Sequence, residues 1–429
     1  MLLRFPPKVE SREALKEHQL KGLKWTVNHA FNNSPFFKES FNKAGVMPDT
    51  IKSLDDLKCL PFTTASDFRD GYPYPMLSVP HEDIVRIHAS SGTTGKRKIV
   101  CYTQKDIDDW LDMFSRCYEM ANLNRNDKVQ ICVGYGVWTA GAGFQLGCER
   151  FGAMAIPSGP GNLEMQMTFL EDFGTTVLCC TASMALLVAQ EVKKRGLKNK
   201  LNLKKIIAGS ERTSPAMKTK IMELLGVEEY YDIPGLTELY GPGTGLSCSE
   251  SENLHYWADY YILEILDPET LEPVPPGEIG EMVYTTLSKE AAPLIRYRSR
   301  DLTRFIEEPC PCGCFLPRHA PILGRSDDMF VVRGVNVYPS EIDTILSKCD
   351  GVGSEYQIIL ERRDDGKDYM TIKVERAERT GATDDMSQSW IYDQVRQKIM
   401  VSPVIEILDY NELPRSERKT KRIFDNRGI

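Results

Sequence analysis

The residues best suited to binding an anion form one short segment, Ala89-Ser90-Ser91-Gly92-Thr93-Thr94-Gly95-Lys96. Its glycines allow backbone N–H groups to converge on a phosphate, the hydroxyl groups add donors, and the lysine supplies positive charge. A Walker loop has a glycine five residues before the glycine of its Gly-Lys pair and a Ser or Thr after the lysine, whereas this chain has Ser90 and Arg97 there. We therefore predict a phosphate-binding loop of another type, with a solvated Ser/Thr turn as the alternative.

A second segment, Cys310-Pro311-Cys312-Gly313-Cys314, is too rich in thiols to be ordinary core packing. Closely spaced cysteines that end at a glycine are typical of a zinc knuckle, in which a tight turn directs two sulfurs at one ion. Such a site needs a second pair of ligands from elsewhere in the chain. A disulfide is the alternative, and a reducing compartment disfavours it.

The composition is that of a folded, soluble protein. The chain has 429 residues, 41% of them hydrophobic and 27% charged, and its 53 Lys and Arg against 61 Asp and Glu give a net charge of −8. A net acidic chain is a poor candidate for a nucleic-acid binder. No window approaches the ~18–20 apolar residues that a membrane-spanning helix needs. The amino terminus lacks the apolar run of a signal peptide, so we expect a cytoplasmic protein with twelve cysteines that are mostly free thiols.

The segments that must position these groups alternate between strand and helix patterns. Strands are expected within 127–134, 174–180 and 203–208, and helices from the cap Thr181 to about Gly196 and from Ser214-Pro215 to Gly226. This alternation predicts a parallel sheet wound by helices, in which ligands collect beyond the carboxyl ends of the strands. Residues 255–287 instead predict an antiparallel ribbon.

Beyond Gly324 the pattern predicts a smaller β-α-β-β-α-β unit. Its expected elements are a strand (329–333), a helix (339–348), two strands (355–361 and 369–374) around a turn at 364–366, a helix (387–400) and a strand (404–408). We therefore predict an α/β protein with two domains. Residues 1–325 would contain the parallel sheets wound by helices and a β-ribbon or barrel part, and residues 326–429 would form a small, mobile α+β domain.

The segment Ser90–Lys96 resembles the signature of the adenylate-forming superfamily, which includes the acyl-CoA synthetases, and its surroundings resemble the phenylacetate-CoA ligase family in particular. The resemblance extends from about residue 5 to residue 429. Further similar motifs follow in order at 135–139 (YGVWT), 147–150 (GCER), 209–211 (GSE), 231–238 (YDIPGLTE), 295–302 (IRYRSRDL), 324–328 (GRSDD), 333–339 (RGVNVYP) and 413–419 (LPRSERK).

The resemblance implies a ligase that joins a carboxylate to the α-phosphate of ATP, releases pyrophosphate and passes the acyl group to coenzyme A. Because two anions must meet, such a site needs cations, and the family places Mg²⁺ on the residue that is Glu238 here. Asp301 would hold the ribose, with pairing to Arg298 or Arg300 as the alternative, and Tyr231 would stack on adenine unless it is a core tyrosine. The implied nucleotide-binding residues are Ser90, Ser91, Gly92, Thr93, Thr94, Gly95, Lys96, Ser210, Glu211, Tyr231, Asp232, Thr237, Asp301 and Arg325.

Lys419 is the residue that the resemblance assigns to catalysis of adenylation, where a lysine of the small domain bridges the carboxylate and the α-phosphate. The chain departs from the family at Arg418, where glycine is usual, and has another lysine at Lys421. A solvated basic tail is the alternative, because residues 414–429 carry six Lys or Arg against two Asp or Glu. The resemblance also implies that the small domain swings after adenylation. The implied coenzyme A and hinge residues are Asp327, Arg333, Gly334 and Tyr338.

The acyl pocket is expected to draw on residues 135–140 and 143–147. Relatives commonly have His-Tyr where this chain has Gln145-Leu146, so the acid itself stays undetermined, with an aryl or arylacetic acid similar to phenylacetate expected. Tyr135 and Trp138 could instead be core aromatics. The implied pocket residues are Tyr135, Gly136, Trp138, Ala140, Gln145, Pro234 and Gly235.

In zinc-containing relatives a Cys…His pair corresponds to Cys248 and His255. The resemblance therefore implies a structural Zn²⁺ site made of Cys248, His255, Cys310 and Cys312, which would staple two loops and take no part in catalysis. Relatives usually have Arg at the third cysteine of the knuckle, so Cys314 would be a spare thiol. A competing ligand set would include Cys314 or His319.

Three hypotheses on function follow. The first is an aryl or arylacetate-CoA ligase, and the second keeps adenylation but uses another acid or an acceptor other than coenzyme A. The third is a zinc-stabilised binding protein with an inactive nucleotide site, which the presence of Thr93, Glu238, Asp301 and Lys419 disfavours. The implied partners are a carboxylic acid, ATP and coenzyme A. We expect no nucleic-acid or membrane partner, and a homodimer is compatible with the sequence.

Overall fold

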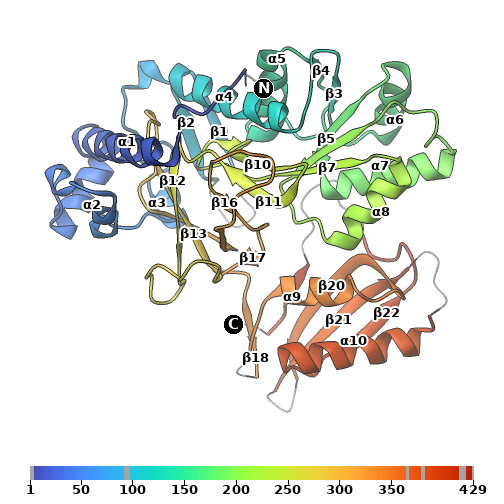
Figure 1. The fold of residues 1–429 in the computed structure, drawn as a ribbon. Helices are drawn as coiled ribbons and strands as arrows, with labels where there is room; N and C mark the ends of the chain where they lie inside the picture. Colours follow the sequence, from blue (N-terminus) through green and yellow to red (C-terminus); the bar gives the residue numbers. More distant parts are fainter. Residues whose placement is uncertain are drawn as a thin grey trace.

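The larger part of the molecule contains a five-stranded parallel sheet (Figure 1). The computed structural model describes residues 4–90, 97–333, 335–363, 367–377, 382–414 and 422–427, without the side chains at 216 and 336. Three of the five strands confirm the strands predicted at 127–134, 174–180 and 203–208. In spatial order the strands are β4 (Met154–Ile156), β3 (Lys128–Ile131), β5 (Val177–Thr181), β6 (Lys205–Gly209) and β7 (Glu229–Ile233).

Different helices cover the two faces of this sheet, so β5 and β6 are buried along their whole length. α4 (Gln104–Met120) and α5 (Thr139–Phe151) share one core with it, and α6 (Leu163–Asp172), α7 (Ala182–Arg195) and α8 (Pro215–Leu225) share the other. As predicted, Thr181 caps α7 and Ser214 caps α8 through their hydroxyl groups. Both helices end at glycines with left-handed backbone, Gly196 (φ 65°) and Gly226 (φ 71°).

The amino-terminal segment is helical and reaches the sheet through a hairpin. The hairpin pairs β1 (Arg86–Ala89) with β2 (Ile99–Tyr102), and β2 leads directly into α4. The preceding helices are α1 (Arg12–Asn33), α2 (Pro35–Ala44) and α3 (Ala65–Asp70), with short 3-10 helices η1 (Pro48–Thr50), η2 (Leu54–Cys59) and η3 (His81–Asp83).

Two antiparallel sheets follow the parallel one. The ribbon predicted at 255–287 is confirmed by the pairing of β12 (Tyr261–Leu266) with β13 (Gly280–Thr286), which β14 (Tyr297–Thr303) and β17 (Gly324–Arg325) extend to four strands. The second sheet has the order β10 (Gly245–Cys248), β11 (Ser251–Tyr256), β16 (Arg318–His319) and β15 (Phe305–Ile306). The short pair β8 (Gly235–Leu236) and β9 (Gly241–Pro242) lies just after β7.

The carboxyl-terminal part departs from the predicted β-α-β-β-α-β order at both of its ends. The strand expected at 329–333 is β18 (Phe330–Val332), which pairs with β19 (Val335–Val337) in a separate hairpin and does not join the sheet. Its place is taken by β23 (Ile423–Asp425), which runs parallel to β20 and was not predicted. The sheet order is β22 (Val404–Leu408), β21 (Asp368–Arg376), β20 (Val352–Arg362) and β23, with helices α9 (Pro339–Leu346) and α10 (Asp384–Ile399). The predicted turn at 364–366 lies outside the described residues.

This carboxyl-terminal part has a hydrophobic core of its own, built from residues between Phe330 and Val401. It touches the larger part at α9, where the Arg212 guanidinium donates to the carbonyl of Ser340 (3.1 Å) and lies 3.3 Å from the Asp343 carboxylate. The separate core agrees with the predicted division near 325–327, which stays a prediction. Among the described residues, we find no helix long and apolar enough to cross a membrane.

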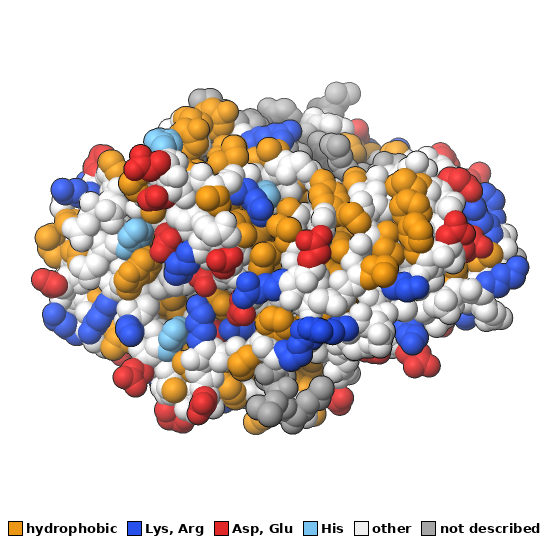
Figure 2. Space-filling model, turned by 90° about the horizontal axis from the view of Figure 1, so that it is seen from above, with side chains coloured by type: hydrophobic (Ala, Val, Ile, Leu, Met, Phe, Trp, Pro, Cys, Tyr) orange, Lys and Arg blue, Asp and Glu red, His pale blue; other side chains and the backbone are white. Residues whose placement is uncertain are grey.

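An apolar groove borders the parallel sheet at its outer strand, β4. Its volume is about 350 Å³, and it is lined by Met154, Ala155, Ile156, Pro157, Phe169 and Phe173. Met154 and Phe173 are among the more exposed large apolar side chains. Figure 2 shows the face of the molecule on the side of α4 and α5, where hydrophobic side chains gather in several groups between charged ones.

Candidate active site

The predicted phosphate loop starts and ends in the β1–β2 hairpin. The N–H of Ser90 donates to the carbonyl of Lys98 (3.0 Å), and the N–H of Lys98 donates to the Ser90 hydroxyl (3.2 Å). These two bonds close the base of the loop. Its binding of a phosphate stays a prediction, because the loop residues Ser91, Gly92, Thr93, Thr94, Gly95 and Lys96 lie outside the described residues.

The strand that enters this loop is joined to the predicted acyl segment. The carbonyl of Val137 accepts a hydrogen bond from the N–H of Ala89 (2.7 Å) and lies 3.2 Å from Nδ1 of the buried His88. One carbonyl of the loop before α5 therefore holds the last residues of β1. The structure thus places the segments predicted to bind nucleotide and acid side by side.

Glu238 lies within reach of this hairpin and is almost completely buried, with 1% of its surface exposed. It forms an ion pair with Lys98 and accepts a hydrogen bond from the Tyr297 hydroxyl (2.8 Å). A buried carboxylate is costly unless a cation and hydrogen bonds compensate it, and these two side chains supply both. Neither was predicted from the sequence. The available signal for Lys98 was the basic run at residues 96–98, whereas Tyr297 is 59 residues away and is brought there only by the fold.

The predicted nucleotide-binding residues beside β6 and β7 differ in how they are placed. Ser210 follows β6 with left-handed backbone (φ 71°), and Glu211 accepts a hydrogen bond from the N–H of Ser183 (2.6 Å). The N–H of Asp232 on β7 donates to the Ser247 hydroxyl (2.9 Å), and burial raises the pKa of the Asp232 carboxyl to about 6. These residues lie at or near the carboxyl ends of neighbouring parallel strands, where ligands of such sheets collect.

Tyr231 does not fit the adenine-stacking role. Its side chain is 1% exposed, belongs to the main hydrophobic core and has its hydroxyl bonded to Glu229. Side chains alternate along a strand, and Tyr231 points into the core on the face of β7 that packs beside α4 and α5. The structure therefore favours the alternative, an ordinary core tyrosine.

Asp301 and Arg325 lie opposite each other on β14 and β17. Arg325 donates to the Asp301 carboxylate (3.2 Å) and makes two further bonds to the carboxylate of Asp327 (2.8 and 2.9 Å). One guanidinium thus connects the predicted ribose-binding carboxylate with the predicted hinge. Arg298, one of the alternative partners considered for Asp301, pairs with Glu281 (2.9 Å).

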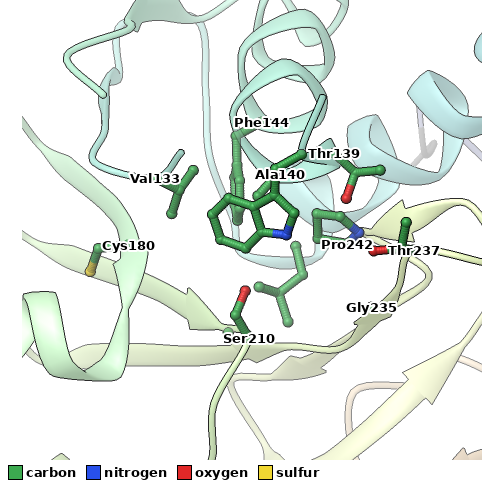
Figure 3. Close-up of a pocket in the computed structure, with 12 residues that line it drawn as sticks. Val133, Thr139, Ala140, Phe144, Cys180, Ser210, Gly235, Thr237 and Pro242 are labelled. Carbon is green, nitrogen blue, oxygen red and sulfur yellow. The ribbon is translucent and has the colours of Figure 1, made fainter. Parts of the chain in front are cut away.

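A small cavity lies between α5 and the ends of β6 and β7, with Val133 and Phe144 on one side and Ser210 on the other (Figure 3). Its volume is about 40 Å³. It brings together predicted acyl residues, among them Trp138, and predicted nucleotide residues, among them Thr237. The complete lining is Val133, Trp138, Thr139, Ala140, Phe144, Cys180, Gly209, Ser210, Ile233, Gly235, Thr237 and Pro242.

Gln145, which was predicted as a pocket residue, is not part of this lining. Ala140 and Phe144 are four residues apart on α5 and share the face toward the cavity, whereas Gln145 is turned by about 100°. Its amide donates to the Glu149 carboxylate (2.9 Å) on the exposed side of the helix. Phe144 from the same segment lines the cavity, and the pocket role of Gln145 stays a prediction.

The remaining predicted acyl residues, Tyr135, Gly136 and Pro234, are not part of this lining. The Tyr135 hydroxyl is buried and has no hydrogen-bond partner among the residues described here. Gly136 has a φ of 82°, a conformation that favours glycine. The Pro234 carbonyl accepts a hydrogen bond from the N–H of Gly243 (3.2 Å).

The residues predicted to serve coenzyme A binding and the hinge lie in the carboxyl-terminal part. Arg333 donates to the carbonyl of Asp368 (2.9 Å), and the N–H of Tyr338, at the start of α9, donates to the Glu341 carboxylate (3.2 Å). Gly334 and the catalytic candidate Lys419 lie outside the described residues, as do Arg418 and Lys421. The roles assigned to them stay predictions.

Four of the predicted metal ligands come together, and none of them lines this cavity. The ligand atoms of Cys248, His255, Cys310 and Cys312 all lie within 4.8 Å of one another. The Cys248 and Cys310 sulfurs are 3.5 Å apart, and the Cys312 sulfur is 3.4 Å from Nε2 of His255. Ligands of one tetrahedral Zn²⁺ are about 3.4–3.8 Å apart, so the donor set fits this ion.

His255 is prepared for such a role by its surroundings. Burial lowers the pKa of His255 to about 4, so its ring is neutral near pH 7 and keeps a lone pair for a metal. Its other nitrogen, Nδ1, faces the carbonyl of Leu316 (3.4 Å), the usual arrangement for a metal-binding histidine. Cys314 and His319 do not belong to the cluster, and Nδ1 of His319 lies 2.6 Å from the carbonyl of Ala320.

Comparison with known proteins identifies the family. The model of the AMP-binding enzyme family matches residues 20–287, and that of the AMP-binding enzyme C-terminal domain matches residues 334–427. The phenylacetate-coenzyme A ligases of Escherichia coli K12 and Pseudomonas putida are 38% and 37% identical to this chain. These alignments cover 99% and 98% of this chain and 98% and 96% of the relatives. The enzyme of the same name from Aromatoleum evansii is 40% identical over 86% of this chain and 83% of its own length.

Solved structures show the same fold. The chain superimposes on a 2-hydroxyisobutyryl-CoA ligase in the postadenylation state with a TM-score of 0.89 and 26% identity, covering 97% of this chain and 91% of the other. The TM-score is 0.71 for the same ligase in the thioesterification state, with 98% and 91% coverage. The arrangement of the two parts is therefore closer to that of the postadenylation structure. Together with the family matches, these similarities show that the chain belongs to the AMP-binding enzymes and, within them, to the phenylacetate-coenzyme A ligase family.

Proposed function

We propose that the protein is an ATP-dependent, AMP-forming acid–thiol ligase that activates a phenylacetate-like carboxylic acid and transfers its acyl group to coenzyme A. The observation that carries the proposal is one cavity lined both by predicted acyl residues, such as Trp138 and Ala140, and by predicted nucleotide residues, such as Ser210 and Thr237. It occurs in a chain that is 38% identical to a phenylacetate-coenzyme A ligase over almost its full length.

The reaction has two steps. In the first, a carboxylate oxygen of the acid attacks the α-phosphorus of ATP, and the bond to the pyrophosphate oxygen breaks. In the second, the sulfur of coenzyme A attacks the acyl carbon, the thiol proton is lost, and AMP leaves. The first step brings anions together, so the chain's cations and its ability to exclude water matter most there.

The described residues suit these demands. Glu238 is proposed to hold Mg²⁺, which would neutralise phosphate charge when bound, and its buried carboxylate already has the cation Lys98 beside it. Asp301 would accept hydrogen bonds from the ribose hydroxyls, with Arg325 fixing its position. Lys419, which lies outside the described residues, would supply the positive charge between carboxylate and α-phosphate as the bond forms.

The second step requires a change of arrangement. We infer that residues 326–429 move as one domain hinged at Asp327, which withdraws Lys419 and brings residues 334–339 to the cavity. The separate hydrophobic core of this part supports the proposal. So does the relative whose two named states match this chain with TM-scores of 0.89 and 0.71.

The cysteine–histidine cluster is proposed to hold a structural Zn²⁺ through Cys248, His255, Cys310 and Cys312. Four protein ligands leave no open position, so the ion would tie the β10–β11 hairpin to residues 310–312 and would not catalyse. The predicted cytoplasmic location and a homodimer stay predictions from the sequence.

The size of the acyl cavity predicts how it selects acids. Its 40 Å³ is far below the roughly 150 Å³ of an engineered cavity that holds benzene, so an aryl group needs lining side chains to move, and Trp138 is the largest of them. Trp138→Ala should therefore raise kcat/KM for phenylacetate relative to acetate by about ten- to a hundredfold. Pyrophosphate release with each acid measures this ratio. Trp25→Ala, on the surface of α1, is the matched control, and an unchanged ratio in Trp138→Ala would contradict the prediction.

The proposed function is tested by pyrophosphate release over a panel of carboxylic acids, with and without coenzyme A. We expect release that depends on the acid and formation of a thioester only when coenzyme A is present. Activation of an acid without a thioester product would favour another acceptor. Protection by ATP against heat with no pyrophosphate from any acid would favour a binding protein and overturn the proposal.

A further inference from the structure

Lys289 is a completely buried lysine that none of the roles above uses. It follows β13, and its ammonium donates to the backbone carbonyls of Glu238 (2.8 Å) and Leu239 (2.5 Å). It also lies over the rings of Tyr102 (5.0 Å) and Tyr240 (5.1 Å). A buried ammonium is expensive unless carbonyls, carboxylates or aromatic faces compensate it, so packing alone would favour an apolar side chain here.

Tyr102 contacts the same stretch of backbone as Lys289, on either side of the carbonyls that Lys289 binds. Its hydroxyl lies 3.1 Å from the carbonyl of Tyr240 and 3.4 Å from that of Thr237. Together, the two side chains hold four successive carbonyls, those of residues 237–240. The backbone from which the Glu238 carboxylate projects is therefore fixed on its buried side.

The loop that carries Lys289 is itself anchored to the helix that follows the phosphate hairpin. The Asp106 carboxylate, in the first turn of α4, accepts hydrogen bonds from the N–H groups of Glu290 (2.7 Å) and Ala291 (3.0 Å). The hydroxyl of Thr103, the cap of α4, donates to the Glu290 carboxylate (2.8 Å). Lys289 and its loop thus connect α4, the helix that follows the phosphate hairpin, to the backbone of Glu238, the proposed metal-binding residue.

We propose that Lys289 is a positioning residue of the nucleotide site, whose ammonium fixes the 237–240 backbone and so holds the Glu238 carboxylate where a nucleotide-bound divalent cation needs it. The inference rests on the proposed function only in taking Glu238 as the carboxylate that receives this cation. Lys98 contacts the carboxylate of Glu238 and Lys289 its backbone, so the two lysines act on different sides of the same residue. Lys289 touches neither the substrate nor the cation in this arrangement.

The test compares Lys289→Met with Arg116→Met. Arg116 is a similarly buried cation (4% exposed) that pairs with Asp259 (2.8 Å), so its loss destabilises the fold without touching residues 237–240. We expect Lys289→Met to weaken the binding of Mn²⁺–ATP at least about tenfold, as measured by electron paramagnetic resonance of bound Mn²⁺. The same variant should raise KM for ATP by a larger factor than that by which it lowers kcat. Arg116→Met should lower Tm by a similar amount but keep Mn²⁺–ATP binding within about twofold of the wild type.

Equal weakening in both variants, or unchanged Mn²⁺–ATP binding in folded Lys289→Met, would overturn the proposal. If Lys289→Met does not fold, Tyr102→Phe removes only the hydroxyl that holds Thr237 and Tyr240 and should weaken binding about threefold. Unchanged binding in Tyr102→Phe would then count against the proposal. Wild-type protein that binds Mn²⁺–ATP but releases no pyrophosphate would reject the proposed function while leaving this test intact.

Discussion

Lys419→Ala is expected to lower the rate of acyl-adenylate formation by at least about a hundredfold while largely sparing thioester formation from supplied acyl-adenylate. The reason is that charge builds up between the carboxylate and the α-phosphate only in the first half-reaction, so a cation placed there lowers only that barrier. In the second half-reaction the proposed domain movement takes Lys419 away from the cavity. Pyrophosphate release and thioester formation, measured separately, give the two rates.

Lys421→Ala is the matched control for this prediction, because it removes the same charge two residues along the same basic tail. It should leave adenylation within a few-fold of the wild type. Equal loss of both half-reactions in Lys419→Ala would reject its assignment to adenylation. A larger loss in Lys421→Ala would show that the departure at Arg418 shifts the register and that Lys421 is the catalytic lysine.

Where local chemistry fixes an element, the sequence was sufficient to predict it. The hydroxyl caps Thr181 and Ser214 and the left-handed glycines Gly196 and Gly226 determine the ends of α7 and α8 within their own few residues. The strand β23 was missed for the opposite reason. It has three residues, lies in a basic tail, and gains its stability from parallel pairing with β20, more than 60 residues earlier in the chain.

The same distinction applies to the site. Motif resemblance identified Glu238, but its partner Tyr297 at the start of β14 and the lysine that holds its backbone, Lys289 in the loop after β13, are brought to it only by the fold. The motif named Gln145 but could not identify Phe144, the neighbouring residue that lines the cavity, because a motif gives the segment and not the helix face, and one residue along α5 turns a side chain by about 100°. Tyr231 shows the corresponding effect of alternation along a strand.

Removal of the proposed Zn²⁺ is expected to destabilise the protein by at least about 3 kcal/mol and to lower its Tm by several degrees. Cys310→Ser should have the same effect, because three ligands hold the ion far less tightly than four. The purified, never-chelated protein should contain one zinc per chain by elemental analysis, and Cys310→Ser should contain much less. Thermal unfolding before and after treatment with a chelator measures the loss of stability.

Cys314→Ser distinguishes the two ligand sets. Its sulfur lies outside the cluster of Cys248, His255, Cys310 and Cys312, so this variant should keep its zinc and its Tm. Loss of zinc in Cys314→Ser, or in His319→Gln, would favour the competing set. The cluster shares no residue with the lining of the proposed acyl cavity. Because it ties the β10–β11 hairpin to residues 310–312, zinc loss should lower Tm by several degrees while pyrophosphate release at 25 °C stays within a few-fold of that of the zinc-loaded protein. A large loss of pyrophosphate release at 25 °C, in zinc-free protein that is still folded, would contradict a purely structural role for the ion.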